Sequence, residues 1–487
     1  MSDAGRQSEQ VRLRARVQLL LWRTHFGVSP AVLDTAFARA QRDSYAAIVE
    51  DILAYPDAPA DPPALPPYPT VPPVQFGADE ATAYPRALVQ LNAARADVNV
   101  AGMVMIRHWW MRQFLSGNAP LRETLALFWH NHFATAAAKV GRADLMLAQN
   151  QRFRTLGAGQ FGTLVQAMAK DAAMLVWLDG KDNARGRPNE NWSRELLELF
   201  TVGISAFTER DVREAARAST GWTFDDATGV PRFDPRLFDS GPKTILGQTG
   251  NFNIDDLAWI TATHPQTARA ICHKLFVWFV SDDPTDTELA PLLAAWNATG
   301  GEIRAVLRTM FLSDAFMPER ATRAHIKHPV AWAVGATRAL EASVPLDRLV
   351  TIVAQLGMDL FDPPDVSGWR GGLGWVTPHG QVLRVNLAGE IVDGILWSLA
   401  GAEGGTAFHR LADRLTGLAV WDDARGRRLI TARADDPQFL TELADRLGGL
   451  PLDDDLRFRL LYLGEQGPDG WHAVIQILLA SPAYQTR

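Results

Sequence analysis

Residues 188–200 read Pro-Asn-Glu-Asn-Trp-Ser-Arg-Glu-Leu-Leu-Glu-Leu-Phe, and they join a strong apolar stripe to a dense polar face. On a helical wheel of about 100° per residue, one side collects Trp192, Leu196, Leu199 and Phe200. The other side collects Asn191, Arg194, Glu195 and Glu198. The stripe predicts a helix packed against a core. The polar face is typical either of a solvated surface or of a functional site.

The same helical periodicity dominates the chain, from segment 11–24 to segment 470–481. In each segment, apolar residues recur at three- and four-residue spacing. Alternating strand patterns are scarce, and the best lie near residues 230–246. We therefore predict a mainly α fold, with a large multi-helix bundle-like body, a long irregular insertion and little β structure.

Proline and glycine divide the chain into regions. Residues 56–73 hold nine of the 29 prolines, which favours an extended strap over a helix. Residues 222–262 are rich in Gly, Asp, Phe and Thr without a long period, which predicts an insertion over the central helices. The expected regions are N-terminal helices at 1–55, a strap at 56–85, a main helical domain with the candidate site at 86–401, and a C-terminal helical subdomain at 402–487.

Composition narrows the classes of function. The net charge of −7 is mild, and no basic stripe suggests nucleic acid. Cys272 is the only cysteine, so disulfides within the chain, multi-cysteine metal sites and covalent c-type haem are excluded. No segment approaches the roughly 20 apolar residues that span a bilayer, and no signal-peptide core is present. We expect a soluble cytoplasmic protein that binds neither nucleic acid nor a membrane.

A second polar cluster is Phe-Trp-His-Asn-His-Phe at residues 128–133. Histidines two apart on a helix point about 200° apart, so His130 and His132 cannot bind one ion together. His130 is the better metal candidate because Glu123 lies on nearly the same face. The alternative for both histidines is a neutral core side chain that is hydrogen-bonded to a carbonyl or carboxylate, and this interpretation is favoured for His132.

Residues 208–222 predict a further helix. Asp211 fits the acidic position of a capping box on Thr208, which explains it structurally. Glu214 lies on the same side as Asp211 and is a functional candidate. For the polar face of 188–200, the structural alternative is a solvated surface with an Arg194–Glu198 pair worth about 0.2–0.5 kcal/mol.

Taken together, these motifs resemble a bacterial family called domain of unknown function 1800. The matching stretches cover nearly the whole chain: 23–27, 127–135, 188–203, 211–222, 243–247, 264–265, 274–275, 327–330, 363–375 and 481–485. Family members are often exported and often encoded beside a sulfatase-like companion, so the resemblance implies a protein partner. This chain has Phe238-Asp239 where the family tends to have His-Asp.

The first functional hypothesis is a metal-dependent enzyme with a small-molecule or peptide substrate. Carboxylate and imidazole ligands between helices suit iron or another divalent ion. A redox metal would support oxidation or hydroxylation, whereas zinc or magnesium would support hydrolysis. The expected ligands are His130, Glu195 and Glu198. The expected catalytic residues are Arg194, which would orient an anionic group, with Glu195 and Glu214. The expected cofactor-binding residues are His130, Trp129 and Asn191.

Three alternatives remain open. A haem could bind non-covalently through one histidine. The polar groups could instead form a buried network in a non-catalytic binding or assembly protein, whose ligand surface would lie on the aromatic loop at 363–376. A third possibility is metal-free acid–base catalysis by a glutamate whose pKa is raised by burial and by its neighbours.

Overall fold

The computed structural model describes residues 3–54, 61–70, 80–321, 325–342, 344–400, 419–422, 427–430, 437–465 and 468–486. Most of these residues are helical, so the prediction of a mainly α fold is confirmed. Residues 56–60 and 71–79 of the expected strap lie outside the described residues. So do residues 402–418 of the expected C-terminal subdomain.

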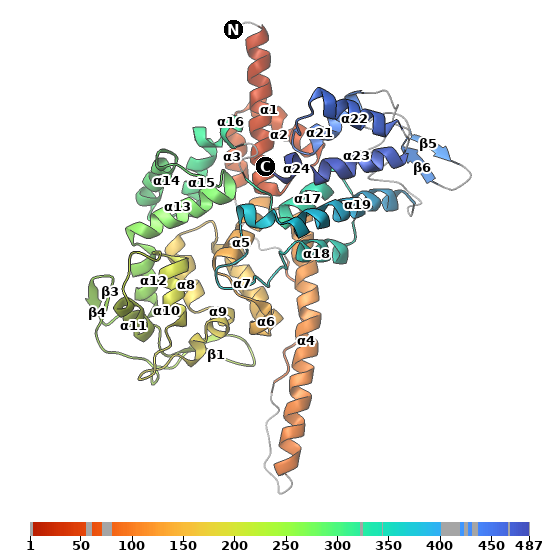
Figure 1. Ribbon diagram of the computed structural model, residues 1–487. Helices are drawn as coiled ribbons and strands as arrows, with labels where there is room; N and C mark the ends of the chain where they lie inside the picture. Colours follow the sequence, from red (N-terminus) through yellow and green to blue (C-terminus); the bar gives the residue numbers. More distant parts are fainter. Residues whose placement is uncertain are drawn as a thin grey trace.

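The N-terminal half has α5 and α7 near the middle of the body, and the N-terminal ends of two long helices, α1 and α4, project beyond the others (Figure 1). Its helices are α1 (Asp3–His25), α2 (Pro30–Arg42), α3 (Tyr45–Leu53), α4 (Glu80–Ser116), α5 (Pro120–His132), α6 (Ala137–Val140), α7 (Ala143–Leu156), α8 (Phe161–Ala169), α9 (Ala172–Trp177), α10 (Asn191–Glu195), the π-helical turn η2 (Leu196–Phe200) and α11 (Glu209–Ala218).

The C-terminal half has α12–α15 to the left of α5 and α21–α23 to the upper right (Figure 1). Its helices are α12 (Ile254–Ala262), α13 (Pro265–Phe279), α14 (Asp286–Thr299), α15 (Ile303–Leu312), α16 (Pro318–Ala321), α17 (Pro329–Ala339), α18 (Leu346–Gln355), α19 (Pro378–Ala400), α21 (Pro437–Arg446), α22 (Asp454–Gly464), α23 (Pro468–Ala480) and α24 (Pro482–Gln485). Short 3-10 turns lie at Gly180–Asp182, Asp314–Phe316 and Gly372–Trp375.

Strands are few and short in the described part of the chain. The antiparallel pairs are β1 (Trp222–Phe224) with β2 (Pro231–Phe233), β3 (Lys243–Ile245) with β4 (Gln248–Gly250), and β5 (Ala419–Asp422) with β6 (Arg427–Ile430). Strands β2 and β3 lie in the region where the sequence predicted them. The expected insertion also contains a helix, α12, which the sequence analysis missed. It is only nine residues long, and a capping box between Asn253 and Asp256 starts it.

The described part of the proline-rich strap, residues 61–70, contains no helix or strand. It is held to α4 by backbone acceptors: Trp109 Nε1 donates to Asp61 O at 2.8 Å, and Arg95 Nε donates to Pro69 O at 2.9 Å. The Arg95 guanidinium also lies 4.9 Å from the Tyr68 ring centroid. Two carbonyls of the strap, which have no helical partners, are therefore satisfied by side chains of the neighbouring helix.

A single apolar cluster links the two ends of the chain. It includes buried residues from Val17 to Tyr484, and the rings of Trp22 and Tyr484 meet edge to face at 6.3 Å. The Tyr484 hydroxyl donates to Trp332 O at 3.1 Å. The expected N-terminal helices therefore share their core with the C-terminal residues. Among the helices that the structure describes, none is long and apolar enough to cross a membrane.

Candidate functional site

The helix expected at 188–200 is present, but its second half is wound as a π-helix. Helix α10 passes directly into η2 at Leu196, and the apolar stripe is buried through Trp192, Leu196 and Phe200. Asn191 is exposed and Nδ2 donates to Asp179 Oδ2 at 3.3 Å. The predicted division into an apolar and a polar face is therefore present. π-turns are rare and occur often at functional sites.

Arg194 pairs with carboxylates other than the one predicted. Its guanidinium donates to Glu209 at 2.8 and 2.9 Å and to Glu190 at 3.1 Å. The proposed Arg194–Glu198 pair is therefore wrong. Glu190 lies one turn earlier, and Glu209 comes from the start of α11, which packs beside α10. Arg194 joins these two helices, and both of its terminal nitrogens already have carboxylate partners.

Glu195 and Glu198 lie half-buried on the polar face. Burial raises the pKa of Glu195, and the neighbouring Glu198 carboxylate raises it further. This direction fits the acid–base hypothesis, which expected a glutamate with a raised pKa.

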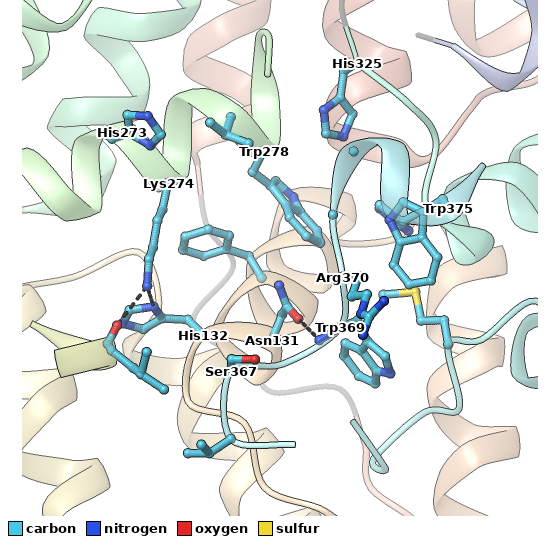
Figure 2. A pocket seen from close by; sticks show the side chains of 18 residues that line it. Asn131, His132, His273, Lys274, Trp278, His325, Ser367, Trp369, Arg370 and Trp375 are labelled. Atoms are coloured by element: carbon cyan, nitrogen blue, oxygen red, sulfur yellow. Dashed lines mark hydrogen bonds between the residues drawn. The ribbon is translucent and has the colours of Figure 1, made fainter. Parts of the chain in front are cut away.

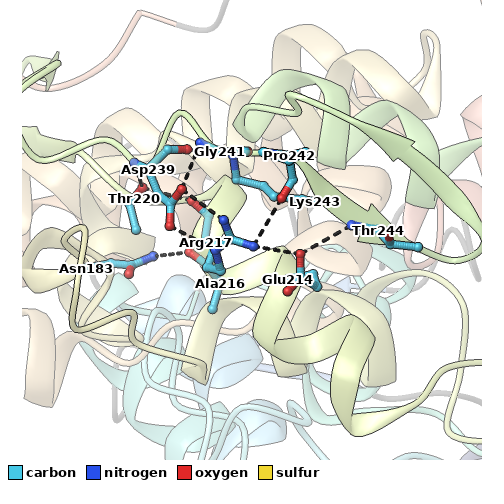
Figure 3. Close-up of polar contacts among 10 residues, drawn as sticks. All are labelled: Asn183, Glu214, Ala216, Arg217, Thr220, Asp239, Gly241, Pro242, Lys243 and Thr244. Atoms are coloured by element: carbon cyan, nitrogen blue, oxygen red, sulfur yellow. Dashed lines mark hydrogen bonds and ion pairs between the residues drawn. The ribbon is translucent and has the colours of Figure 1, made fainter.

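Glu214 belongs to a network that fastens the insertion to α11 (Figure 3). Arg217 donates to Glu214 at 2.8 Å and to both carboxylate oxygens of Asp239, at 2.8 and 3.1 Å. Glu214 also accepts the Thr244 backbone N–H at 3.2 Å. Lys243 Nζ donates to Asp239 O at 2.5 Å. These contacts give Glu214 a structural role.

The start of α11 also agrees with the sequence, because the predicted capping box between Thr208 and Asp211 is confirmed.

Trp129 is buried in the core, and its Nε1 donates to Gly157 O at 2.8 Å. His130 is 1% exposed, and the rings of Trp110, Phe153, Phe361 and Trp369 surround it at 5.4–6.1 Å. Burial lowers the pKa of His130 to about 3. Its Nε2 has no hydrogen-bond partner among the described residues. One alternative is that His130 is a core histidine with a hydrogen bond to a carbonyl or carboxylate, and its Nε2 atom does not support that alternative.

Glu123, expected near His130, is instead paired with a buried cation. Arg154 Nη1 donates to Glu123 Oε1 at 2.6 Å, and Trp110 Nε1 donates to Glu123 Oε2 at 3.1 Å. Across the described ranges, no three His, Cys, Asp or Glu side chains gather in a way that could hold a metal ion. His130, Glu195 and Glu198 are thus not brought together as a ligand set. Binding of a metal ion or haem stays a prediction.

The structure does bring chemistry-bearing side chains together in a cavity of about 370 Å³ (Figure 2). Its walls come from the end of α5, from η2, from α13, from the segment before α17 and from the loop before α19. Aromatic rings of Phe128, Trp278, Trp369 and Trp375 form much of the lining. The loop at 363–376, which one hypothesis expected to carry a ligand surface, forms one side of this cavity.

Asn131 fixes that loop to α5. Its Oδ1 accepts the Trp369 backbone N–H at 2.6 Å. Gly368 has φ +88°, and a Cβ there would lie 2.3 Å from Asn131 O. Only glycine allows the loop to approach the helix this closely. The hydrogen bond from the Trp369 backbone N–H to the Asn131 side chain therefore fixes Trp369 in the cavity wall.

His132 and Lys274 form the polar wall of the cavity (Figure 2). His132 Nε2 lies 3.0 Å from Phe200 O, and Lys274 Nζ lies 3.2 Å from His132 Nδ1. Lys274 Nζ also donates to Leu199 O at 2.8 Å. The favoured interpretation of His132 as a core histidine bonded to a carbonyl is confirmed. Both side chains satisfy carbonyls that the end of η2 leaves without helical donors.

The surrounding protein lowers the pKa of both His132 and Lys274. Burial and the Lys274 charge lower the pKa of His132 well below its ordinary value. The Lys274 side chain is open to the cavity, yet surrounding protein removes hydration from its ammonium and lowers its pKa to about 8. The cavity therefore contains a neutral imidazole beside an amine that titrates near neutral pH.

The opposite side of the cavity is lined by His325 and Arg370, and the Asp282 carboxylate contacts His325 from outside the lining. His325 Nδ1 lies 2.8 Å from Asp282 Oδ1, and the Trp278 ring stacks on His328 at 5.0 Å. Arg370 is exposed to the cavity and has no ion-pair partner among the described residues. Of the described residues that line the cavity, none is Asp or Glu. The lining therefore favours a negatively charged ligand.

The sequence analysis did not identify Lys274, His325 or Arg370 as site residues. A signal was present, because Lys274, His328 and residues 363–375 all fall in stretches that match the family pattern. Those stretches are far apart in the chain and converge only in three dimensions.

Comparison with known proteins gives a family and no function. No curated protein and no solved structure matches the chain. A family model does match residues 19–486, nearly the whole length. The family is described as "Protein of unknown function (DUF1800)", and the chain belongs to it.

Proposed function

We propose that the chain is an enzyme for a small organic acid with an apolar or aromatic body, bound in the cavity between α5, α13 and the loop at 363–376. The observation that supports this proposal is the lining itself. It combines Lys274 and Arg370 with tryptophan rings and contains no acidic side chain among its described residues. Concave sites with apolar walls and a few convergent polar groups are the usual form of small-molecule sites.

Arg370 is the group best suited to hold the acid. A guanidinium binds a carboxylate through two parallel hydrogen bonds. Arg194, the arginine predicted for this role, is instead occupied by Glu190 and Glu209. The rings of Trp369 and Trp375 lie near Arg370 in Figure 2 and would take the apolar body of the ligand.

Lys274 supports catalysis rather than binding alone. An amine with a pKa of about 8 exchanges protons readily at neutral pH, and general acid–base groups work best when their pKa is near the ambient pH. Metal-dependent oxidation through His130, Glu195 and Glu198 is a separate prediction, and metal analysis of the purified protein tests it independently of the cavity.

Titration with aromatic acids tests the proposed ligand class. Benzoate and phenylacetate should quench the fluorescence of the cavity tryptophans and bind about tenfold or more tightly than benzamide, because a charge-assisted hydrogen bond contributes about 1.5–3 kcal/mol. Arg370→Gln should remove that preference. The matched control is Arg236→Gln, whose side chain is 86% exposed and pairs with Asp234.

The proposal is wrong if no aromatic acid binds with a Kd below about 1 mM. It is also wrong if Arg370→Gln leaves the preference for the acid over the amide unchanged. Equal losses in the Arg370 and Arg236 variants would show a general charge effect and would contradict a specific site.

A further inference from the structure

The hydrogen bonds at Lys274 orient its amine nitrogen and determine which side of it can react. Phe200 O can only accept a hydrogen bond, so the His132 ring carries its hydrogen on Nε2 and its lone pair on Nδ1. Lys274 Nζ therefore faces two acceptors, Leu199 O and His132 Nδ1. A neutral amine has two N–H donors and one lone pair. With both donors used, its lone pair is left for the cavity.

The surroundings increase the population of this neutral form. No acidic side chain of the described residues lines the cavity, so no ion pair there holds Lys274 as an ammonium. With a pKa of about 8, roughly a quarter of the amine is unprotonated at pH 7.5. An ordinary lysine at that pH is unprotonated in about one molecule in a thousand.

The presence of lysine rather than arginine at position 274 is also informative. Only six of the 48 basic residues in the chain are lysines. An arginine could donate to the same two acceptors, Leu199 O and His132 Nδ1, but a guanidinium stays charged and is not a nucleophile. Capping of η2 alone therefore does not require lysine at this position.

We propose that Lys274 is a nucleophile that forms an imine with an aldehyde or ketone whose acid group is held at Arg370. This inference rests on the proposed function and names its substrate class, an oxo acid with an apolar body. The Lys274 nitrogen lone pair adds to the carbonyl carbon, so that a carbon–nitrogen bond forms while the carbonyl π bond breaks and its electron pair moves to the oxygen. The carbonyl oxygen then leaves as water with the two amine hydrogens.

His132 is the positioning and proton-transfer partner in this step. Its Nδ1 lone pair already faces Lys274 Nζ at 3.2 Å. Burial keeps this imidazole neutral and weakly basic, so it acts as a transient relay that takes a proton from the attacking nitrogen and returns it to the departing hydroxyl, and no other reactant is needed. The Phe200 carbonyl keeps the imidazole in the required tautomer.

Reductive trapping tests the proposal on the full-length protein. The probe is 4-formylbenzoate with sodium cyanoborohydride at pH 7.5, followed by proteolysis and mass spectrometry. We expect the adduct on Lys274 to form about tenfold or more faster than on any of the other five lysines, because of its larger unprotonated fraction. Lys274→Arg should lose this adduct, and Lys181→Arg, a change at a surface lysine paired with Asp182, should retain it.

The rates of labelling of the different lysines are compared within the wild-type chain, so this measurement does not require any variant to fold. Equal labelling of Lys274 and Lys181 overturns the proposal. Labelling of Lys274 that excess benzoate does not suppress also overturns it, because the aldehyde would not be reacting from within the cavity. Benzoate binding without preferential trapping at Lys274 would refute only the imine. Absence of benzoate binding would refute the proposed function itself.

Discussion

Replacement of His130 by phenylalanine should make the protein less sensitive to acid. In the folded chain the pKa of His130 is lowered from 6.5 to about 3, because burial disfavours the imidazolium. Below pH 6.5 the unfolded chain therefore binds a proton that the folded chain does not, and stability falls as pH falls. Between pH 7.5 and pH 5 this one residue accounts for a loss of about 2 kcal/mol in the free energy of unfolding, at about 1.36 kcal/mol per pKa unit.

Urea unfolding followed by tryptophan fluorescence at pH 7.5 and pH 5 measures this loss. His130→Phe should lose about 2 kcal/mol less than the wild type over that interval. It should keep some acid sensitivity, because burial lowers the pKa of His25 in the same way. His379→Phe is the control, since this histidine is exposed.

A pH dependence in His130→Phe within about 0.5 kcal/mol of the wild type would refute the reasoning. The same variant also addresses the metal hypothesis. A divalent ion that raises the melting temperature of the wild type but not of His130→Phe would instead support His130 as a ligand.

Three further predictions concern the ion pair, the loop and the amine. Glu123→Ala should cost about 3–5 kcal/mol in urea unfolding, because it leaves the buried Arg154 without a counter-charge, whereas the double change Glu123→Leu with Arg154→Met should recover most of that loss. Gly368→Ala should cost more than about 2 kcal/mol and weaken benzoate binding, since its φ is +88° and a Cβ would overlap Asn131. The rate of trapping at Lys274 should rise with pH and level off above about pH 8, whereas an ordinary lysine keeps gaining reactivity toward pH 10.4.

The sequence predicted local structure well because local structure depends on neighbouring residues. The 3.6-residue period identified the helical fold. The spacing of Thr208 and Asp211 identified a helix start, and the setting of His132 suggested a carbonyl partner that the structure provides at Phe200. Each of these inferences needs only the geometry of one helix.

The candidate site could not be predicted in the same way, because wheel geometry shows which residues share a face but not which faces meet. The wheel pairs Arg194 with Glu198 on its own helix, although the actual partners include Glu209 of α11. Glu214 is a functional candidate on the wheel, although it pairs with Arg217 of its own helix and accepts the Thr244 backbone N–H of the insertion. Lys274 looks like an ordinary helical residue until α13 is placed against the carbonyls of η2.

The cavity is assembled from segments that lie between residues 128 and 375 of one chain with a continuous core. Its walls therefore exist together only when these distant segments are folded against one another. A ligand that binds there stabilises the folded chain by mass action, by an amount that grows with the logarithm of its concentration relative to Kd. Resistance of the intact chain to proteolysis thus becomes a means of screening for the natural substrate before its reaction is known.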